Sequence, residues 1–466
     1  MEKYRIERDS MGEVNVPRDA YWGAQTQRAI DNFRVSGTGF PFAFIRSLAL
    51  VKRASATVNQ RLGLLEPRLG RAISKACDEI TGGKLAGQFP LDIYQTGSGT
   101  STNMNANEVI ATRANEILTG SRHSKDPIHP NDHVNLGQSS NDVIPTVIHV
   151  SAYLQTVGEL LPALEHFAKA LRQKQKQYTH LVKTGRTHLM DAMPITLSQE
   201  ISGWAAQVEA SIARVKSALP RLSELAIGGT AIGTGINTNS KFGRLVAKEL
   251  SSLTKVKFAE APNHFEAQAA QDGVVELSGQ LKTYATALLK ISNDLRWMNS
   301  GPIAGLAELR LPSLQPGSSI MPGKVNPVIP EAARMVAVQV MGNDFVIGVS
   351  NALGEFQLNV MLPLIAHKIL ESIALLANVT RLMADRVIDG FEVNADHMKQ
   401  LLHRNPILAT VLNPIIGYDK SAEVVKKALK ENKTVRQVVV EMGYLTAPEA
   451  DRILDPQKMT KPGFSG

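Results

Sequence analysis

The stretch from Gly317 to Pro327 holds the residue types best suited to chemistry. It contains two serines, a lysine and an asparagine between glycines and prolines. Glycine and proline interrupt helices, which predicts a loop. Pro327 and Pro330 fit the start of a following helix, where free backbone N–H groups favour an anion. Lys324 adds a full positive charge. The stretch therefore predicts a site for a carboxylate or a phosphate, and the alternative is an ordinary connector between helices.

Three further polar loops lie next to expected helices. They run from Gly97 to Asn105, from Gln138 to Asp142 and from Gly185 to Ala192. Each alone is typical of turns and helix caps, which favour Ser, Asn and Gly. Together with the Gly317 stretch, they offer clustered hydroxyl, amide and backbone donors, which can stabilise a developing negative charge without a metal. We therefore expect the four loops to form one site, either within one chain or between chains.

The four loops resemble those of the fumarase/aspartase superfamily. The pattern Gly-Ser-Ser-x-Met-Pro-x-Lys-x-Asn-Pro is complete from Gly317 to Pro327, and Gly-Arg-Thr-His ends at His188. The resemblance begins at Tyr21 and covers nearly the whole chain. It implies a homotetrameric helical lyase with active sites shared between subunits. Within the superfamily the chain is most similar to class II fumarate hydratases, which implies reversible trans addition of water to fumarate, giving L-malate in the tricarboxylic acid cycle.

The resemblance also implies a role for each site residue. Ser318 is expected to take the C3 proton of malate, His188 to act as acid and base at the hydroxyl, and Glu331 to orient His188. The charge that develops on the neighbouring carboxylate, an aci-carboxylate, then needs the donors of the loops. The residues implied to hold the substrate are Ser98, Gly99, Thr100, Ser139, Ser140, Asn141, Thr187, Ser319, Lys324, Val325 and Asn326.

Two alternative functions remain open. The first is that of an aspartase, an ammonia-lyase, which typically has glutamine at the position of His188 and a small apolar residue at that of Ser98. Hydroxide is a poor leaving group that needs a proton as it departs, whereas ammonia leaves without one, so His188 favours hydration. The second alternative is a helical scaffold without catalysis, which predicts a damaged catalytic set. All of Ser318, His188, Lys324, Asn326 and Glu331 are present.

Two other motifs have less specific meanings. His129 and His133 are spaced for a zinc pair, but Pro130 indicates a loop or helix start and no third ligand is evident. Fumarases resemble this segment, which implies a secondary dicarboxylate site at His129, Pro130, Asn131 and Asp132. The glycine-rich run from Gly228 to Gly235 lacks the Lys-Ser/Thr of a P-loop and follows an expected helix, which favours a connection between helices. Neither a metal nor a cofactor is expected.

Helices are the elements expected to position these loops. We predict helices over 42–61, 68–82 and 104–118, long ones near 144–178, 196–226, 265–299, 331–352 and 357–388, and short ones over 421–432 and 434–442. In 265–299, apolar residues recur at alternating steps of three and four, at Val274, Leu277, Leu281, Tyr284, Leu288, Ile291, Leu295 and Met298. A helix of ~35 residues is about 50 Å long, so this seam needs parallel partners.

The sequence thus predicts an all-α chain built on an elongated central five-helix bundle. Three domains are expected: a mixed helical and loop domain over 1–138, the bundle over 139–393 and a small helical domain over 394–466. Apolar residues on more than one face of the long helices, such as Val275 and Leu289, indicate burial against other subunits. This pattern agrees with the homotetramer that the resemblance implies.

Composition and charge narrow the class of protein. The chain has 466 residues, 43% of them apolar, and a net charge of +8. The single cysteine, Cys77, excludes an intrachain disulfide and indicates a reducing compartment, so a cytoplasmic location is expected. No apolar run reaches the ~18 residues of a membrane span, and the N-terminus has no apolar signal region. The positive charge fits steering of an anionic substrate. Nucleic acid and membrane are not expected as partners, since no long basic run appears.

Overall fold

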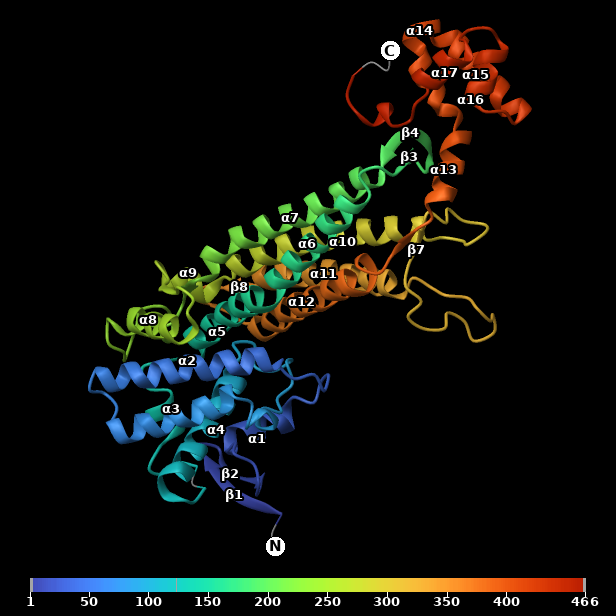
Figure 1. Cartoon of the computed structure of the whole chain (residues 1–466). Coiled ribbons are helices and arrows are strands. Elements are labelled where there is room, and N and C mark those ends of the chain that lie inside the picture. The colour runs from blue at the N-terminus through green and yellow to red at the C-terminus, as the bar shows by residue number, and fades with distance from the viewer. Residues whose placement is uncertain (1–2, 123, 464–466) are drawn as a thin grey trace. The chain divides into compact units, whose positions relative to one another are not determined.

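The computed structural model describes residues 3–122 and 124–463, and these are mainly helical with short strands (Figure 1). The chain forms two compact units. Unit 1 comprises Met1–Pro162, Ala213–Ala285 and Val338–Ala377, and unit 2 comprises Ala163–Ile212, Thr286–Ala337 and Asn378–Gly466. The prediction of an all-α protein built on a bundle of long helices is confirmed.

The long helices are α5 (Ser140–Gln155), α6 (Leu161–Gln177), α7 (Leu197–Leu222), α10 (Asp272–Met298), α11 (Val328–Ala352) and α12 (Leu362–Met383). Single π-helical turns, η3 (Thr156–Leu160) and η4 (Ala384–Ile388), follow α5 and α12. The single helix predicted near 144–178 is observed as α5, η3 and α6 in succession. The bounds of the other predicted long helices agree to within about five residues, except around residue 270, as described below.

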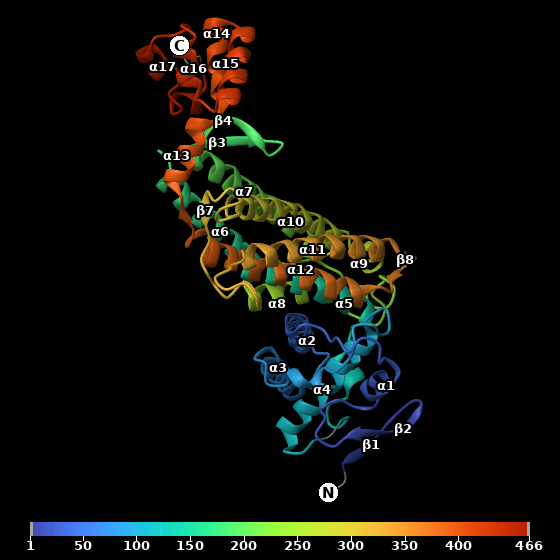
Figure 2. The same cartoon turned by 90° about the vertical axis from the view of Figure 1, so that its right-hand side faces the viewer.

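Long helices run side by side inside each unit (Figure 2), and polar side chains join them. In unit 1, Asp344 of α11 accepts hydrogen bonds from Ser278 and Lys282 of α10 at 2.8 and 2.6 Å. In unit 2, the Trp204 indole of α7 donates to Asp294 of α10 at 2.9 Å. These bonds join helices that are far apart in the sequence. They add polar contacts to the packing of the apolar faces.

The predicted seam of α10 is buried along its whole length. The eight residues of this seam, the first Val274 and the last Met298, are between 0% and 4% exposed. The helix does not begin at Phe265, however. A short helix, α9, covers His264–Ala269, the next residue Ala270 has an extended backbone, and α10 starts at Asp272. The prediction of one helix over 265–299 was therefore wrong at its first turns, because the side chain of Asn351 accepts the Gln271 N–H at 2.5 Å and replaces the helical partner.

The first part of unit 1 packs α1 (Ala24–Asn32), α2 (Phe42–Arg61), α3 (Pro67–Thr81) and α4 (Thr100–Thr119) beside a hairpin of β1 (Tyr4–Asp9) and β2 (Gly12–Pro17). Buried Glu108 of α4 accepts hydrogen bonds from the backbone of Gly23, Gln25 and Thr26 at 2.9 to 3.1 Å. The N-terminus of α1 is thereby capped by a carboxylate from another helix, which its dipole favours.

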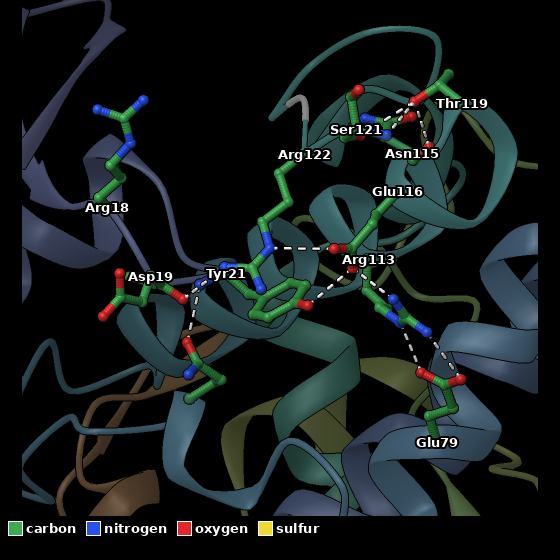
Figure 3. Close-up of polar contacts among 12 residues, drawn as sticks. Arg18, Asp19, Tyr21, Glu79, Arg113, Asn115, Glu116, Thr119, Ser121 and Arg122 are labelled. Carbon is green, nitrogen blue, oxygen red and sulfur yellow. Dashed lines mark hydrogen bonds and ion pairs between the residues drawn. The ribbon is translucent and has the colours of Figure 1, made fainter. Parts of the chain in front are cut away.

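A second polar network holds the N-terminal segment against α4 (Figure 3). The Tyr21 hydroxyl donates to Glu116 at 2.8 Å, and the Arg122 guanidinium lies 4.2 Å from the Tyr21 ring centroid. Arg113 binds Glu79 of α3 with two nitrogens, at 2.6 and 3.1 Å, and also contacts Glu116. Tyr21, where the resemblance begins, is therefore held by structural contacts and lies outside the predicted site.

In unit 2, a hairpin of β3 (Val182–Thr187) and β4 (Met190–Thr196) contacts α13 (Ala395–Arg404), as Figure 1 shows. It was not predicted, and the loop expected there is a pair of strands. After η5 (Pro406–Leu412), the chain ends in α14 (Asn413–Ile416), α15 (Tyr418–Glu431), α16 (Val435–Glu441) and α17 (Ala447–Ile453). The predicted helices over 421–432 and 434–442 are confirmed as α15 and α16.

The remaining elements are short connections. In unit 1, α8 (Phe242–Thr254) follows β5 (Glu224–Leu225), which pairs in parallel with β6 (Ala259–Glu260), and β8 (Gly354–Glu355) pairs with β9 (Leu358–Asn359). In unit 2, β7 (Leu309–Arg310) pairs with β10 (Glu392–Val393). The run from Gly228 to Gly235 lies between α7 and α8, which confirms it as a connection between helices.

Two helices are long and apolar enough to span a membrane by length and composition alone, Val328–Ala352 and Leu362–Ile388. The second has 61% of its apolar window buried, as is usual for a core helix, but the first has only 28% buried. Val338, Phe345 and Val349 of α11 are 61%, 72% and 46% exposed. Their spacing of seven and four residues puts them on one side of the helix, and we call them the α11 stripe.

Candidate active site

The Gly317 loop is closed on itself by hydrogen bonds between its two ends. The Gly317 N–H donates to the Lys324 carbonyl at 2.7 Å, and the Asn326 side chain donates to the Gly317 carbonyl at 2.7 Å. A Cβ at Gly317 would lie 2.5 Å from the Lys324 carbonyl oxygen, so a side chain cannot be accommodated there without opening the loop. The segment is thus an ordered loop, compact enough to fix the residues between its ends.

Ser318 occupies a special place in this loop. Its Oγ accepts two backbone N–H groups, from Ile320 at 3.2 Å and from Met321 at 3.0 Å. Two N–H donors on one hydroxyl oxygen favour its negatively charged form, in the same way that an oxyanion is stabilised. Both donors come from the same loop, two and three residues after Ser318.

Lys324 and Asn326, both expected to bind a carboxylate, contact each other. The exposed Lys324 ammonium donates to Asn326 Oδ1 at 2.7 Å, which leaves its remaining N–H groups available. Asn326 and Pro327 lead into α11, whose first turn contains Glu331. The helix start predicted near Pro327 and Pro330 is confirmed. Ser319 and Val325 are exposed on the same loop.

Replacing Gly317 by alanine should lower kcat/KM by at least ~10-fold, because the new methyl group must separate Gly317 from Lys324 and so displace Ser318. The thermal unfolding midpoint should change little, since the loop makes few buried contacts. Gly323→Ala is the matched control. Gly323 has a φ of +79°, but no atom lies within 4 Å of the position of its Cβ, so only a local strain of about 1 kcal/mol is expected. Equal activities of the two variants would contradict this explanation.

His188 stands at the tip of the β3–β4 hairpin. His188 and Leu189 are the two turn residues between the paired Thr187 and Met190, and both have positive φ, 55° and 61°. Such a turn matches the twist of a hairpin but normally takes glycine or asparagine. A histidine held there at a cost in backbone energy is typical of a functional position. His188 and Thr187 are both exposed.

A buried ionic cluster supports this hairpin. The Arg186 guanidinium donates to Glu308 at 2.7 Å, and the Lys183 ammonium lies 3.3 Å from the other Glu308 oxygen and 3.2 Å from Glu200. The side chains of Lys183 and Glu308 are 2% and 1% exposed. Gly185 lets the two strands approach closely, because a Cβ at this position would lie 2.5 Å from the Met193 carbonyl oxygen. Paired charges on strand β3 and its neighbours therefore hold in place the hairpin that carries His188.

In unit 1, the first two loops lie at the N-termini of α4 and α5. Ser98 Oγ and Thr100 Oγ1 are 2.7 Å apart, and Gly99 caps α4 with a φ of +73°. A Cβ at Gly99 would touch the Ile144 side chain of α5 at 3.0 Å. The two helix starts are therefore neighbours, and two N-terminal ends of helices together favour an anion.

The second loop is held in place by Asp142. Ser139 caps α5 and accepts the Asn141 N–H at 3.2 Å, while its own N–H donates to Asp142 at 2.9 Å. The other oxygen of buried Asp142 accepts the N–H groups of Gly228 and Thr230, each at 3.0 Å. Burial raises the pKa of Asp142, and these N–H bonds oppose the shift. Asn141 donates to the Ala231 carbonyl at 2.7 Å. Ser140 begins the helix.

The predicted site residues thus form two sets. Unit 1 brings together Ser98, Gly99, Thr100, Ser139, Ser140 and Asn141, and unit 2 holds Thr187, His188, Ser318, Ser319, Lys324, Val325, Asn326 and Glu331. Among the described residues of unit 2, no hydrogen bond joins His188 to Glu331. Sequence reasoning missed Asp142 and Glu308 as supports, and it could not have paired them with segments so distant in the chain.

The segment expected to form a secondary site is a five-residue π-helical turn, η2 (Pro130–Val134). His129 caps it: its Nδ1 accepts the N–H groups of Asn131 and Asp132, each at 3.3 Å. Asp132 Oδ2 lies 3.2 Å from the same nitrogen. The two groups form an ion pair only when His129 is protonated, and a protonated Nδ1 could no longer accept the two N–H groups. His133 Nδ1 accepts the His129 N–H at 2.8 Å. Over residues 3–122 and 124–463, no three His, Cys, Asp or Glu side chains are grouped to hold a metal.

Comparison with known families matches most of the chain. A family described as "Lyase" matches residues 12–342, and one described as "Fumarase C C-terminus" matches residues 408–461. The first of these alone covers more than half of the chain. The first match includes the four polar loops described above. The second match includes the helices α15 to α17.

Individual relatives agree with these families over the full length. The class II fumarate hydratase of Xylella fastidiosa (strain Temecula1) is 56% identical over 99% of this chain and 97% of its own. That of Mycobacterium tuberculosis (strain H37Rv) is 53% identical over 98% of this chain and 96% of its own. The crystal structure of class II fumarase from Schistosoma mansoni superposes with a TM-score of 0.96 at 42% identity, covering 98% of this chain and 99% of that one.

Proposed function

This chain belongs to the class II fumarate hydratases, and from that premise we propose how its residues carry out the reversible hydration of fumarate to L-malate. The observation that supports the proposal most directly is the Ser318 hydroxyl with two backbone N–H donors, inside a loop closed at Gly317. A serine is a weak base unless its alkoxide is stabilised, and these donors supply that stabilisation.

In the direction from malate, Ser318 takes the proton from C3 through its Oγ. The electron pair moves into the neighbouring carboxylate and gives an aci-carboxylate, whose added charge is stabilised by Lys324, Asn326 and the polar donors of the loops. The electron pair then returns to form the C2–C3 double bond as the C2–O bond breaks. His188 delivers a proton, through a water, to the departing hydroxide, so that water and fumarate are released. In hydration the same groups act in reverse.

The two sets of residues divide the work of binding. The converging N-termini of α4 and α5, with Ser98, Thr100, Ser139, Ser140 and Asn141, suit one carboxylate of the substrate. The Gly317 loop, with Lys324 and Asn326, suits the other. Thr187 and His188 approach the leaving group, and Glu331 polarises His188. Because His188 and Glu331 are not bonded within the described chain, we propose that the full site is assembled from more than one subunit.

The activity has a direct test. L-malate and L-aspartate are supplied separately to the purified protein, and fumarate is followed by its ultraviolet absorbance. Release from malate should be faster by orders of magnitude, because the leaving hydroxide receives its proton from His188, a group that ammonia does not need. Faster release from aspartate would show an ammonia-lyase, and no release from either would show a scaffold without catalysis.

We propose a homotetramer, for which the α11 stripe supplies the argument. Exposed apolar side chains at Val338, Phe345 and Val349 cost free energy in water unless another surface covers them. A second copy of the chain is the occupant that fits, since α10 and α12 also expose large apolar side chains, Trp297 at 50% and Leu382 at 41%.

Sedimentation equilibrium should therefore give a mass four times that of the 50.6 kDa chain. Val349→Glu should weaken the assembly, because a charge in an apolar contact is poorly solvated. Leu429→Glu is the control, since Leu429 of α15 is 65% exposed and lies outside the stripe. A mass near 50.6 kDa for the unaltered protein would contradict the proposal.

Two finer proposals complete the assignment. The buried, unpaired Cys77 fits a reducing compartment, and we place the enzyme in the cytoplasm.

We also retain a secondary dicarboxylate site at His129, Pro130, Asn131 and Asp132. His129 Nε2 remains free for a carboxylate because Nδ1 is occupied by the backbone of η2.

A further inference from the structure

Lys52 of α2 is a fully buried lysine with no hydrogen-bonded carboxylate. Its side chain is 0% exposed, and its ammonium donates to Asn135 Oδ1 at 2.9 Å and to Gln138 Oε1 at 3.1 Å. Burying an ammonium group that only neutral amides contact is costly, and such lysines are rare. A methionine of similar size would fill the same space without that cost. The position therefore calls for an explanation other than packing.

The first consequence of these bonds is geometric. Gln138 uses its other amide atom to donate to the carbonyls of Val134 and Leu136, at 3.1 and 3.2 Å. Its side chain thus bridges the Lys52 ammonium and the turn that follows η2. Gln138 immediately precedes Ser139, the cap of α5. Lys52 therefore fixes the turn that delivers the residues at the start of α5.

The second consequence is electrostatic. Lys52 interacts with the charge of buried Asp142 in the first turn of α5, but the Asp142 oxygens are already occupied by three backbone N–H groups. Burial lowers the pKa of Lys52 to about 7, and Asp142 opposes this shift. Any further negative charge bound at the N-terminus of α5 would favour the protonated lysine.

The other helices around Lys52 add little charge of their own. From α4, Asn103 and Asn107 donate neutral amides to Asn135 Oδ1, at 3.3 and 3.2 Å. From α3, Cys77 faces the ammonium, but burial raises the pKa of its thiol to about 12, so it stays neutral. From α8, Glu249 is paired with Arg61 at 2.7 Å. Asp142 is thus the carboxylate that acts on Lys52.

We infer that Lys52 is a positioning residue for Ser139, Ser140 and Asn141, and that its buried charge favours a doubly charged substrate at the N-terminus of α5. The inference rests on the proposed function, which gives those three residues a carboxylate to bind. A substrate with two negative charges gains more from a buried cation than a substrate with one, because the interaction grows with the charge of the ligand. Lys52 thus contributes to specificity without touching the substrate.

The first test is Lys52→Met, which removes the charge and keeps the volume. The KM for fumarate should rise at least ~10-fold, with kcat lowered by less than about threefold. The protein should unfold at a somewhat lower temperature, because Gln138 Oε1 loses its buried donor. Lys174→Met is the matched control. Lys174 is 8% exposed and donates to the Phe391 carbonyl at 3.2 Å in unit 2, so its loss should leave KM unchanged. An unchanged KM in Lys52→Met would overturn the inference.

Ligand charge separates an electrostatic role from a merely structural one. Inhibition constants are measured for succinate, with two carboxylates, and for crotonate, with one. Lys52→Met should weaken succinate ~10-fold or more and crotonate by a smaller factor, because the second carboxylate of succinate adds its own interaction with the lysine. Lys52→Arg, which keeps the charge, should retain most of the affinity for succinate. Equal losses for both ligands would overturn the electrostatic part of the inference.

A second measurement keeps the inference testable if Lys52→Met does not fold. Succinate binding to the His188→Gln variant, which lacks that imidazole, is followed by calorimetry near pH 7 in buffers with different heats of ionisation. Proton uptake is expected, since the bound dianion raises the pKa of Lys52 above its value of about 7 in the free protein. Binding without uptake would overturn the inference. If the unaltered enzyme hydrates fumarate, either failure concerns Lys52 alone and not the proposed function.

Discussion

Replacing Ser318 by alanine should lower kcat by at least ~10²-fold while the affinity for a dicarboxylate inhibitor stays within about threefold. The substitution removes the oxygen that we propose accepts the C3 proton, and it leaves Lys324, Asn326 and the closed loop in place. The Ile320 and Met321 N–H groups lose their partner, but both residues are exposed and water can replace it. Steady-state rates in both directions and an inhibition constant for succinate give the two quantities.

Ser313→Ala is the control for this prediction. Ser313 is an exposed serine in the segment before the loop, and no role is proposed for it. Its replacement should leave kcat and KM unchanged. Near-normal turnover of Ser318→Ala would assign the base to another residue. Loss of inhibitor binding together with turnover would mean that Ser318 holds the loop closed, and does not act on the C3 proton.

His188→Gln should suppress malate dehydration and fumarate hydration by ~10² to 10⁴-fold, the usual contribution of one acid or base group. Glutamine cannot deliver a proton to a leaving hydroxide. The hairpin should remain folded, since Arg186, Lys183 and Glu308 anchor it below the turn. Leu189→Gln is the matched control, because Leu189 occupies the neighbouring turn position, has a φ of 61° and is also exposed. Intact hydration by His188→Gln would refute the leaving-group role.

The same two variants test whether subunits share a site. Inactive Ser318→Ala and His188→Gln chains are unfolded together and refolded as a mixture. If Ser318 and His188 of one site come from different chains, mixed assemblies contain some sites with both native residues, and part of the activity returns. Each variant refolded alone is the control. A mixture as inactive as its components would place both residues in one chain.

The helices were predictable because their signals are local. The apolar period of α10 shows its buried face, and the predicted bounds of α2, Phe42 and Arg61, are those observed. Glycine and proline around Ser318 marked the loop for the same reason. In these cases the residues that determine the structure are neighbours in the chain, so their types and spacing are sufficient.

The errors arose where distant residues replace local ones. The break at Ala270 depends on an acceptor from Asn351, about 80 residues away. The hairpin at His188 has no glycine or asparagine at its turn, so the usual signal of such a turn is missing. The site residues were named through the family pattern, but the supports were not. Asp142 could not be matched to Gly228, nor Lys52 to Gln138, from sequence alone.

The α11 stripe also has a consequence for how the protein is made. A newly synthesised chain that has folded its helices still carries Val338, Phe345 and Val349 facing water. For the homotetramer proposed above, the last step of folding is an encounter between chains, whose rate depends on concentration. Recovery of activity from denaturant should accelerate with protein concentration. At very low protein concentration, yield should be lost because chains stay monomeric. At very high protein concentration, yield should be lost to aggregates.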